Sequence, residues 1–203
     1  MAVSLLIILS VVVIFAGSRL YSQYREQVIR TEESQLLTMA GIVGNNLNSY
    51  MEQQLEEIDL FYSQEGMPEN VWAESGGINA RTAYFLKNNA GVYNWITVTE
   101  PDGTKFRYEL GKKTFRESAD GEVKAVDSQD GNHPAEITGK EISDQTGWYE
   151  LYIEKNVPVG SEVYMLTFAM DLGALYEKIV APVKIGEAGY SSVKDQNMNI
   201  IMH

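Results

Sequence analysis

Residues 161–180 read SEVYMLTFAMDLGALYEKIV, and this stretch decides the fold. It is almost wholly apolar over Val163–Ala169, which predicts a central strand buried on both faces. Asp171 is a favourable N-cap, and the residues after it place apolar side chains at helical spacing: Leu172, Leu175, Tyr176 and Ile179. The stretch therefore predicts a strand that leads directly into a short amphipathic helix over Leu172–Val180, within an α+β fold.

The residues after this helix begin a second strand pair. Pro182 ends the helix, and strands are predicted over Tyr190–Lys194 and Ile200–His203. Such a pair leaves sheet edges that other strands normally cover. We therefore expect the sequence to be the front part of a longer protein, in which residues 181–203 open a second module.

The composition is that of a globular protein with an acidic surface. Apolar residues make up 44% of the 203 residues, and 12 Tyr and 3 Trp supply large side chains for a core. The chain has no Cys, which excludes disulfides, thiolate nucleophiles and Cys-ligated zinc. Its net charge of −12 argues against a nucleic-acid partner, because a phosphate-binding surface needs clustered Lys and Arg.

The N-terminal stretch Met1–Gly17 contains no charged residue. We interpret residues 1–20 as a transmembrane anchor, because residues 5–16 are almost wholly apolar and the residues after them form an interfacial fringe. The alternatives are a cleaved signal peptide, which normally starts with basic residues, and a core helix, which normally alternates apolar and polar positions. The acidic, aromatic-rich remainder is typical of an exported domain. The expected location is therefore the cell membrane, with this domain outside the cytoplasm.

A long helix is predicted over residues 21–63, which contain no Pro and little Gly. Apolar residues recur there three or four apart: Leu36, Met39, Val43, Leu47, Met51, Leu55, Ile58 and Phe61. A helix of this length exceeds what a small domain needs for packing. It either forms a stalk that pairs with a second copy of the chain, which predicts a homodimer, or packs along one domain in its C-terminal half.

Residues 64–180 have the pattern of one sheet-containing module. The turn Glu100-Pro101-Asp102-Gly103 is a strong hairpin signal, because Pro presets φ and Gly accepts a positive φ. The other expected elements are a helix over Asn79–Asn88, strands over Val92–Thr99, Thr104–Leu110, Glu122–Val126, Ala135–Ile142, Trp148–Glu154 and Glu162–Met170, and a connection at Val157–Gly160.

The order of these elements resembles the double Cache (PAS-like) sensor domains of bacterial transmembrane receptors. Gly189-Tyr190 with the ending Ile200-Ile201-Met202-His203 looks like the strand pair that opens the membrane-proximal module of that family. Met170-Asp171-Leu172 similarly resembles the Asp-Leu that closes the membrane-distal module. Met198 stands where the family's turn usually carries Gly, so the geometry of that turn is open.

The resemblance implies a complete membrane-distal module at residues 64–180 and the start of a membrane-proximal module at 181–203. It implies an extracytoplasmic domain that binds a small molecule and transmits the signal through the membrane. The output, a histidine kinase, a diguanylate cyclase or a chemoreceptor domain, would follow His203. No enzymatic activity and no cofactor are expected within these residues.

The predicted ligand-binding residues are mainly aromatic: Trp148, Tyr149 and Tyr164, with Tyr152 on the same pair of strands. Asp144 could pair with a ligand amine, and Arg116 or Arg107 with a carboxylate. The alternative is that these aromatic residues fill the core. The amino-acid-binding members of the family carry Arg-x-Trp-Tyr, whereas this chain has Thr146-Gly147-Trp148-Tyr149, so amino-acid recognition does not carry over.

Other functions lack their motifs. The two His residues, His133 and His203, have no metal-site spacing, and Asp127, Asp130, Asn132 and Glu136 do not match a calcium loop. A hydrolase would need a nucleophile motif such as Gly-x-Ser-x-Gly, which is absent. The main alternative is a pilin-like surface protein. Such subunits need a leader-peptidase site and an acidic residue early in the apolar segment, and Met1–Gly17 has neither.

Overall fold

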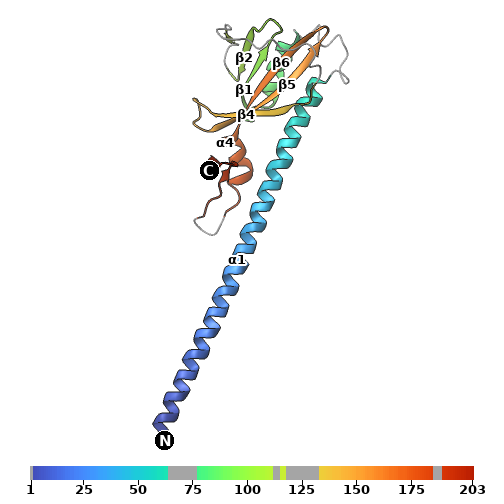
Figure 1. Ribbon diagram of the computed structural model, residues 1–203. Coiled ribbons are helices and arrows are strands. Elements are labelled where there is room, and N and C mark those ends of the chain that lie inside the picture. The colour runs from blue at the N-terminus through green and yellow to red at the C-terminus, as the bar shows by residue number, and fades with distance from the viewer. Residues whose placement is uncertain (1, 64–76, 112–114, 118–132, 185–188) are drawn as a thin grey trace. The chain divides into compact units, whose positions relative to one another are not determined.

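The computed structural model describes residues 2–63, 77–111, 115–117, 133–184 and 189–203 (Figure 1). Only the backbone is described for residues 2–11 and 115–117. The chain divides into two compact units, residues 1–45 and residues 46–203. Its elements, in order, are α1 (Ala2–Tyr62), α3 (Gly77–Asn88), β1 (Tyr93–Thr99), β2 (Lys105–Glu109), β3 (Phe115–Glu117), β4 (Glu136–Ile142), β5 (Tyr149–Val159), β6 (Glu162–Asp171), α4 (Leu172–Leu175), the π-helical turn η2 (Tyr176–Val180), β7 (Val193–Lys194) and β8 (Ile200–Met202).

The second unit is built on an antiparallel sheet with the strand order β3-β2-β1-β6-β5-β4. The strand predicted to be central, β6, lies between β1 and β5, and its Leu166, Phe168 and Ala169 are fully buried. An apolar run buried on both faces is what such a position requires. The α+β prediction is therefore confirmed.

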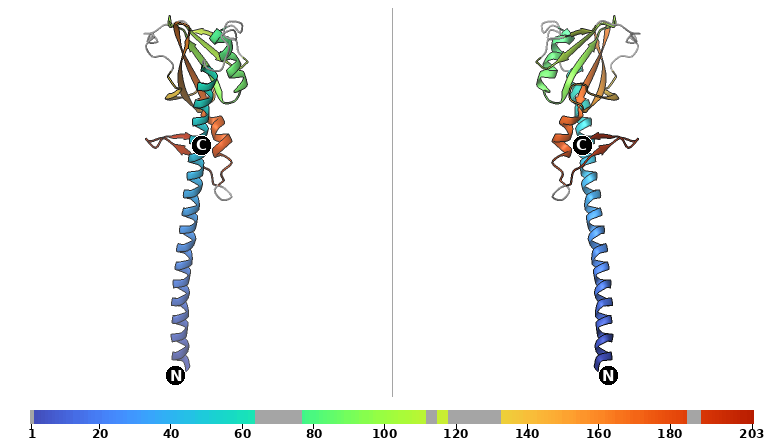
Figure 2. Two further views of the ribbon diagram at one scale, coloured as in Figure 1. Left: turned by 90° about the vertical axis from the view of Figure 1, so that its right-hand side faces the viewer. Right: turned by 90° about the vertical axis from the view of Figure 1, so that its left-hand side faces the viewer.

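One face of the sheet, the core face, packs against helices. Phe168 pairs in register with Ile96 on one side and Ile153 on the other, and all three are fully buried. The ring of Tyr62, from the end of α1, lies 5.9 Å from the ring of Phe168. Phe85 of α3 lies 5.6 Å from the same ring, so α1 and α3 cover this face (Figure 2). Burial of these rings supplies the main driving force for folding.

Polar groups fix the end of α1 to the sheet. Lys155 is 3% exposed, and its Nζ lies 2.8 Å from Asp59 Oδ1 on α1. Tyr93 donates its hydroxyl proton to Gln54 at 3.2 Å. Arg81 of α3 donates to the carbonyl of Phe61, which satisfies one of the free carbonyls at the helix end. These contacts set the register of residues 46–62 on the core face.

The apolar stripe predicted along the long helix is divided between the two units. In the second unit Ile58 is fully buried under the sheet, as the packing alternative requires. In the first unit Leu36 and Met39 are exposed. In the part of the chain whose residues are described, no helix is both long and apolar enough to cross a membrane. The predicted anchor falls in large part on residues 1–11, whose side chains lie outside the described residues.

The hairpin β5–β6 is longer than predicted. The expected connection Val157–Gly160 is wrong for its first three residues, because β5 continues to Val159 and Pro158 pairs in register with Val163. Pro is tolerated there because β4 pairs with β5 only as far as Glu154, which leaves an edge that needs no amide donor. The other expected strands and the helix over Asn79–Asn88 are confirmed to within a few residues. Glu122–Val126 lies outside the described residues.

The predicted cap and the final strand pair are also confirmed. Asp171 accepts a hydrogen bond from the Gly173 amide at 2.8 Å and opens α4. Strands β7 and β8 pair antiparallel across a turn in which Met198 has a φ of 65°. This left-handed conformation is the one that Gly usually supplies, so Met198 occupies a position that favours Gly.

Candidate functional site

The candidate site lies on the outer face of the sheet, the face opposite to α1 and α3. Because side chains alternate along a strand, Trp95, Thr97 and Thr99 of β1 point to this face while Ile96 and Val98 fill the core. Register places four further side chains on the same face, along a row that runs from Arg107 of β2 to Glu141 of β4. We call these five residues the outer-face cluster: Trp95, Arg107, Glu141, Glu150 and Tyr152.

A β-bulge in β1 brings two donors to one carboxylate. The register shifts between Tyr93 and Trp95, so Asn94 is an extra residue in the strand. Asn94 Nδ2 donates to Glu150 Oε1 at 2.7 Å, and Trp95 Nε1 donates to Glu150 Oε2 at 3.1 Å. Each oxygen of Glu150 therefore has one neutral donor. The bulge positions Glu150 with two fixed hydrogen bonds.

Glu150 is a buried carboxylate among other acids. It is 4% exposed, and the register places Glu141 of β4 on one side of it and Asp171 of β6 on the other. Like charges directly opposite each other across a sheet destabilise it. Among the ion pairs between described residues, none joins a Lys or Arg to Glu150 or Glu141. The register therefore places three carboxylates side by side on this face.

Two aromatic rings stand beside these carboxylates. Trp95 and Tyr152 both pair in register with Ala169, whose small side chain lets the two rings approach to 5.5 Å between centroids. The guanidinium of Arg107 lies 4.2 Å from the centroid of Trp95, and its Nε lies 2.9 Å from Glu109 Oε1. The positive charge of Arg107 is therefore already shared between a ring and a carboxylate.

The carboxylate of Glu141 binds the hydroxyl of Tyr152 and helps to raise its pKa. The hydroxyl of Tyr152 donates to Glu141 Oε2 at 3.1 Å. Partial burial, this hydrogen bond and the nearby negative charges raise the pKa of Tyr152 to about 12, against a smaller opposing effect of Arg107. The hydroxyl thus stays protonated at neutral pH. The cluster therefore presents aromatic faces, carboxylate acceptors and one phenol.

On the same face, β1 continues beyond Trp95 with small polar side chains. Thr97 is 8% exposed and Thr99 is 2% exposed, and the hydroxyl oxygen of Thr99 has no hydrogen-bond partner among the described residues. Within the described residues, no group of three or more His, Asp or Glu side chains is placed to hold a metal ion. The hydroxyl groups of Thr97 and Thr99 add hydrogen-bonding capacity to this face.

The structure places the predicted ligand residues outside this cluster. The ring of Trp148 stacks on Tyr176 of η2, with 5.6 Å between centroids, and it covers Gly173 of α4. Tyr149 lies under Nζ of Lys140, 5.5 Å from its ring centroid. Trp148 and Tyr149 therefore pack where the sheet meets α4 and the C-terminal strand pair, and both are half-buried.

The other predicted residues are dispersed. Asp144 is exposed in the β4–β5 turn. Tyr164 lies on the core-face side near the β5–β6 turn and donates to Glu162 at 3.0 Å. Arg116 belongs to β3, and its side chain lies outside the described residues. No finding tests a ligand role for these residues, so that role stays a prediction.

Two residues that the sequence analysis considered do belong to the cluster, Tyr152 and Arg107. Trp95, Glu141 and Glu150 were missed. The hydrogen bond between Trp95 and Glu150 joins residues that are 55 apart in the sequence and depends on a bulge, and neither feature leaves a local pattern. The available signal was Glu150 between the large apolar residues Tyr149 and Leu151, because a charged residue at a buried position needs partners.

Comparison with known proteins shows what this fold is. No family model matches the chain, and no curated protein matches it. Solved structures do match. The ligand-binding domain of the Campylobacter jejuni chemoreceptor Tlp3, in complex with 4-methylisoleucine, has a TM-score of 0.54 and 13% identity, over 84% of this chain and 70% of that one. The extracellular domain of the putative histidine kinase vpHK1S-Z8 has a TM-score of 0.51 and 15% identity, over 72% of this chain and 60% of that one.

These two matches show that the fold is Cache-like. A third match is a domain of a putative sensory box/GGDEF family protein from Vibrio parahaemolyticus, with a TM-score of 0.49 and 16% identity over 74% of this chain. The chain spans 64% of the length of that domain and 60% of the length of the histidine kinase domain. At these identities the comparison shows the Cache-like fold, and function must be argued from the cluster.

Proposed function

We propose that this chain is an extracytoplasmic ligand-sensing domain of a bacterial transmembrane receptor, and that it binds a small molecule with a positively charged amine at the outer-face cluster. The observation that carries the proposal is Glu150, a buried carboxylate held by two neutral donors. The Cache-like fold supports the sensor role, since the matched structures are described as extracellular or ligand-binding domains of receptors.

The charge of the cluster favours a cation. Glu150 of β5 and Glu141 of β4 lie directly opposite each other on neighbouring strands, and a positive group between them would remove their repulsion. The ring of Tyr152 offers a face to the same group, and aromatic faces attract cations, whereas the ring of Trp95 already carries the guanidinium of Arg107. A buried acid, a second acid and the ring of Tyr152 together form a site for an ammonium group.

The contacts of Arg107 predict whether the ligand carries a carboxylate. It was predicted as a possible partner of a ligand carboxylate, but its guanidinium is already paired with Glu109 and stacked on Trp95. A carboxylate would have to compete with Glu109 for it. We therefore expect amines that lack a carboxylate to bind more tightly than the amino acids from which they derive.

The experiment is a thermal-shift screen of the full chain against matched pairs, such as tyramine with tyrosine and putrescine with ornithine. A ligand at a hundredfold excess over its dissociation constant stabilises the folded state by about 2.7 kcal/mol and raises the midpoint. We expect a shift with an amine that is lost in Glu150→Gln and kept in Glu162→Gln, an exposed glutamate on the same sheet. Absence of any shift across amines, amino acids and organic acids would contradict the sensor proposal and favour a structural role such as that of a pilin-like protein.

A second pair of variants separates the outer-face cluster from the residues predicted first. If the ligand binds the cluster, Trp95→Ala abolishes the shift. Trp148→Ala lowers the midpoint of the free protein but keeps the response, because Trp148 packs on Gly173 and Tyr176. The opposite result would return the ligand site to Trp148.

The receptor proposal includes a homodimer and membrane attachment. In the first unit Leu36, Met39 and Ile42 are exposed apolar residues on one long helix, and such a helix is stable in water only with a partner. Sedimentation equilibrium of residues 21–203 should show dimers that Leu36→Lys/Met39→Lys converts to monomers.

The apolar residues 5–16 support the proposed membrane anchor. Alkaline carbonate extraction of membranes from cells that express the whole chain tests this attachment.

A further inference from the structure

We propose that the edge strand β4 couples occupancy of the outer-face cluster to the β7–β8 hairpin, through the ion pair between Lys140 and Asp195. The inference rests on the proposed function and adds the route by which the ligand's effect would leave the sheet. It assigns distinct tasks to two neighbouring residues of one strand, Lys140 and Glu141.

These neighbours point to opposite faces of β4, because side chains alternate along a strand. Glu141 pairs in register with Glu150 and accepts the hydroxyl proton of Tyr152, so it belongs to the outer-face cluster. Lys140 pairs in register with Leu151, and its ammonium reaches Asp195 in the turn between β7 and β8. A displacement of β4 at Glu141 therefore also moves Lys140.

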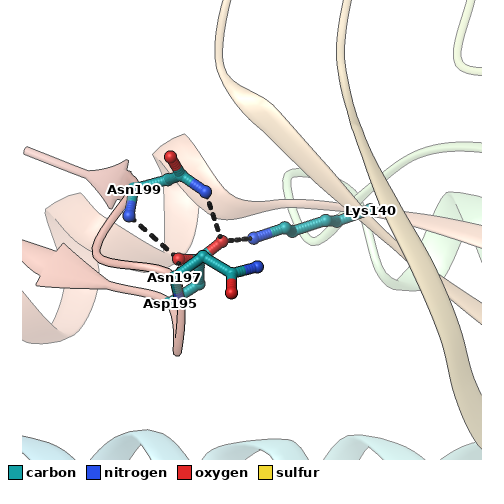
Figure 3. Close-up of polar contacts among 4 residues, drawn as sticks. All are labelled: Lys140, Asp195, Asn197 and Asn199. Carbon is teal, nitrogen blue, oxygen red and sulfur yellow. Dashed lines mark hydrogen bonds and ion pairs between the residues drawn. The ribbon is translucent and has the colours of Figure 1, made fainter.

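Asp195 organises the turn that Lys140 reaches (Figure 3). One carboxylate oxygen accepts from the amides of Asn197 at 2.8 Å and Asn199 at 2.9 Å. The other accepts from Lys140 and from the side-chain amide of Asn199 at 3.1 Å. Lys140 and Asn199 hold the pKa of Asp195 well below its usual range. The carboxylate of Asp195 thus stabilises the turn and also links it to β4.

The edge position and low burial of β4 allow this strand to move. It lies at the edge of the sheet and pairs only with β5, and a bulge lies between Ile137 and Gly139. Its seven residues are exposed or half-buried, in contrast to the buried β6. Strands with few buried contacts open at low free-energy cost. β4 is therefore the strand of this sheet whose position a ligand can change most easily.

A bound cation would favour one of two positions of β4 over the other. Without a cation, Glu141 and Glu150 repel each other across the β4–β5 pair. With a cation between them the repulsion is removed and β4 packs more tightly on β5. Because the ligand then favours one position of β4 over the other, its binding shifts the population of the states that Lys140 transmits.

The test uses charge neutralisation and needs no ligand. Glu141→Gln removes the repulsion while leaving an acceptor for Tyr152. Hydrogen exchange of the full chain, read at residues 193–202, should slow by about threefold in this variant, a size in keeping with a partly exposed ion pair. In Lys140→Met/Glu141→Gln the slowing should disappear, and in the matched control Lys194→Met/Glu141→Gln it should remain, because Lys194 is an exposed lysine next to Asp195.

A second variant leaves β4 untouched. Asp195→Asn keeps an oxygen for the turn amides and removes the charge that pairs with Lys140, so Asp195→Asn/Glu141→Gln should also lose the slowing. Equal exchange of residues 193–202 in the wild type and in Glu141→Gln overturns the coupling, and so does a response that persists without Lys140.

This outcome is separate from the outcome of the amine screen. If an amine binds at Glu150 and exchange in the hairpin does not change, the ligand proposal holds and the coupling is wrong. If Glu141→Gln slows the hairpin and no amine binds, the coupling holds and the ligand proposal is wrong.

Discussion

Nζ of Lys155 lies 2.8 Å from Oδ1 of Asp59, which ties a strand of the sheet to the end of α1. Lys155 is 3% exposed, and Asp59 also accepts the amide of Ala135 at 2.8 Å. A charge this deeply buried is tolerated because it is paired. The pair fixes how the helix sits on the core face of the same unit.

This ion pair predicts a non-additive effect of mutation. Asp59→Ala leaves the ammonium without its carboxylate and should lower the free energy of unfolding by about 2–3 kcal/mol. Asp59→Ala/Lys155→Met removes both charges and should recover most of that loss. Urea denaturation measures both, with Glu56→Ala, an exposed acid on α1, as the control that changes little. Equal destabilisation in the single and double variants would mean that the pair is not the cause.

Gly173 gives a prediction that runs against helix propensity. Gly→Ala within a helix normally stabilises by up to about 1 kcal/mol. A Cβ on Gly173 would lie 2.7 Å from Cγ of Trp148, so Gly173→Ala should instead destabilise by about 1–3 kcal/mol. In a Trp148→Ala background the same change should be neutral or stabilising. Thermal unfolding of the four variants measures the coupling, and an equal effect of Gly173→Ala in both backgrounds would contradict it.

The buried tyrosines predict loss of stability at high pH. Burial raises the pKa of Tyr62 and Tyr93 far above the ordinary value, and the pKa of Tyr108 and Tyr152 rises to about 12. Above about pH 10 the unfolded chain releases these protons while the folded chain keeps them, so the free energy of unfolding falls as pH rises. It should be nearly constant as pH approaches 10 from below and fall between pH 10 and 12.

Urea titrations at stepped pH measure this fall. Tyr93→Phe removes one of the four phenols and should make the decline shallower, at the cost of the hydrogen bond to Gln54. Tyr84→Phe, at an exposed tyrosine, should leave the slope unchanged. A slope that is the same in all three proteins would show that Tyr93 does not contribute to it.

The fold could be predicted from local patterns, and most of the candidate site could not. The apolar run of β6 and the Asp171 cap are signals within a few residues, and both appear where expected. The cluster depends on the pairing of β1 and β5 with the central strand β6 and of β4 with β5, and the partners are decided by register and by the bulge at Asn94. The packing of Trp148 depends on the missing side chain of Gly173, 25 residues later, which no local pattern reveals.

Glu150 predicts a conflict between stability and binding. In the free protein its charge is buried opposite Glu141, so Glu150→Gln should leave the free energy of unfolding unchanged or raise it by about 0.5–1 kcal/mol. The glutamine oxygen can still accept from Asn94 or Trp95. Residues that destabilise the free protein are commonly kept for function.

The same variant should lose the amine response in the thermal-shift screen. Urea denaturation of the free protein and the ligand-induced shift are therefore measured on one sample, with Glu154→Gln, a half-buried acid on the same strand, as the matched control. A large destabilisation by Glu150→Gln, of more than about 2 kcal/mol, would make Glu150 a structural acid that holds the bulge. In that case a lost response would report disruption of β1, and the amine site would have to be sought elsewhere on the outer face.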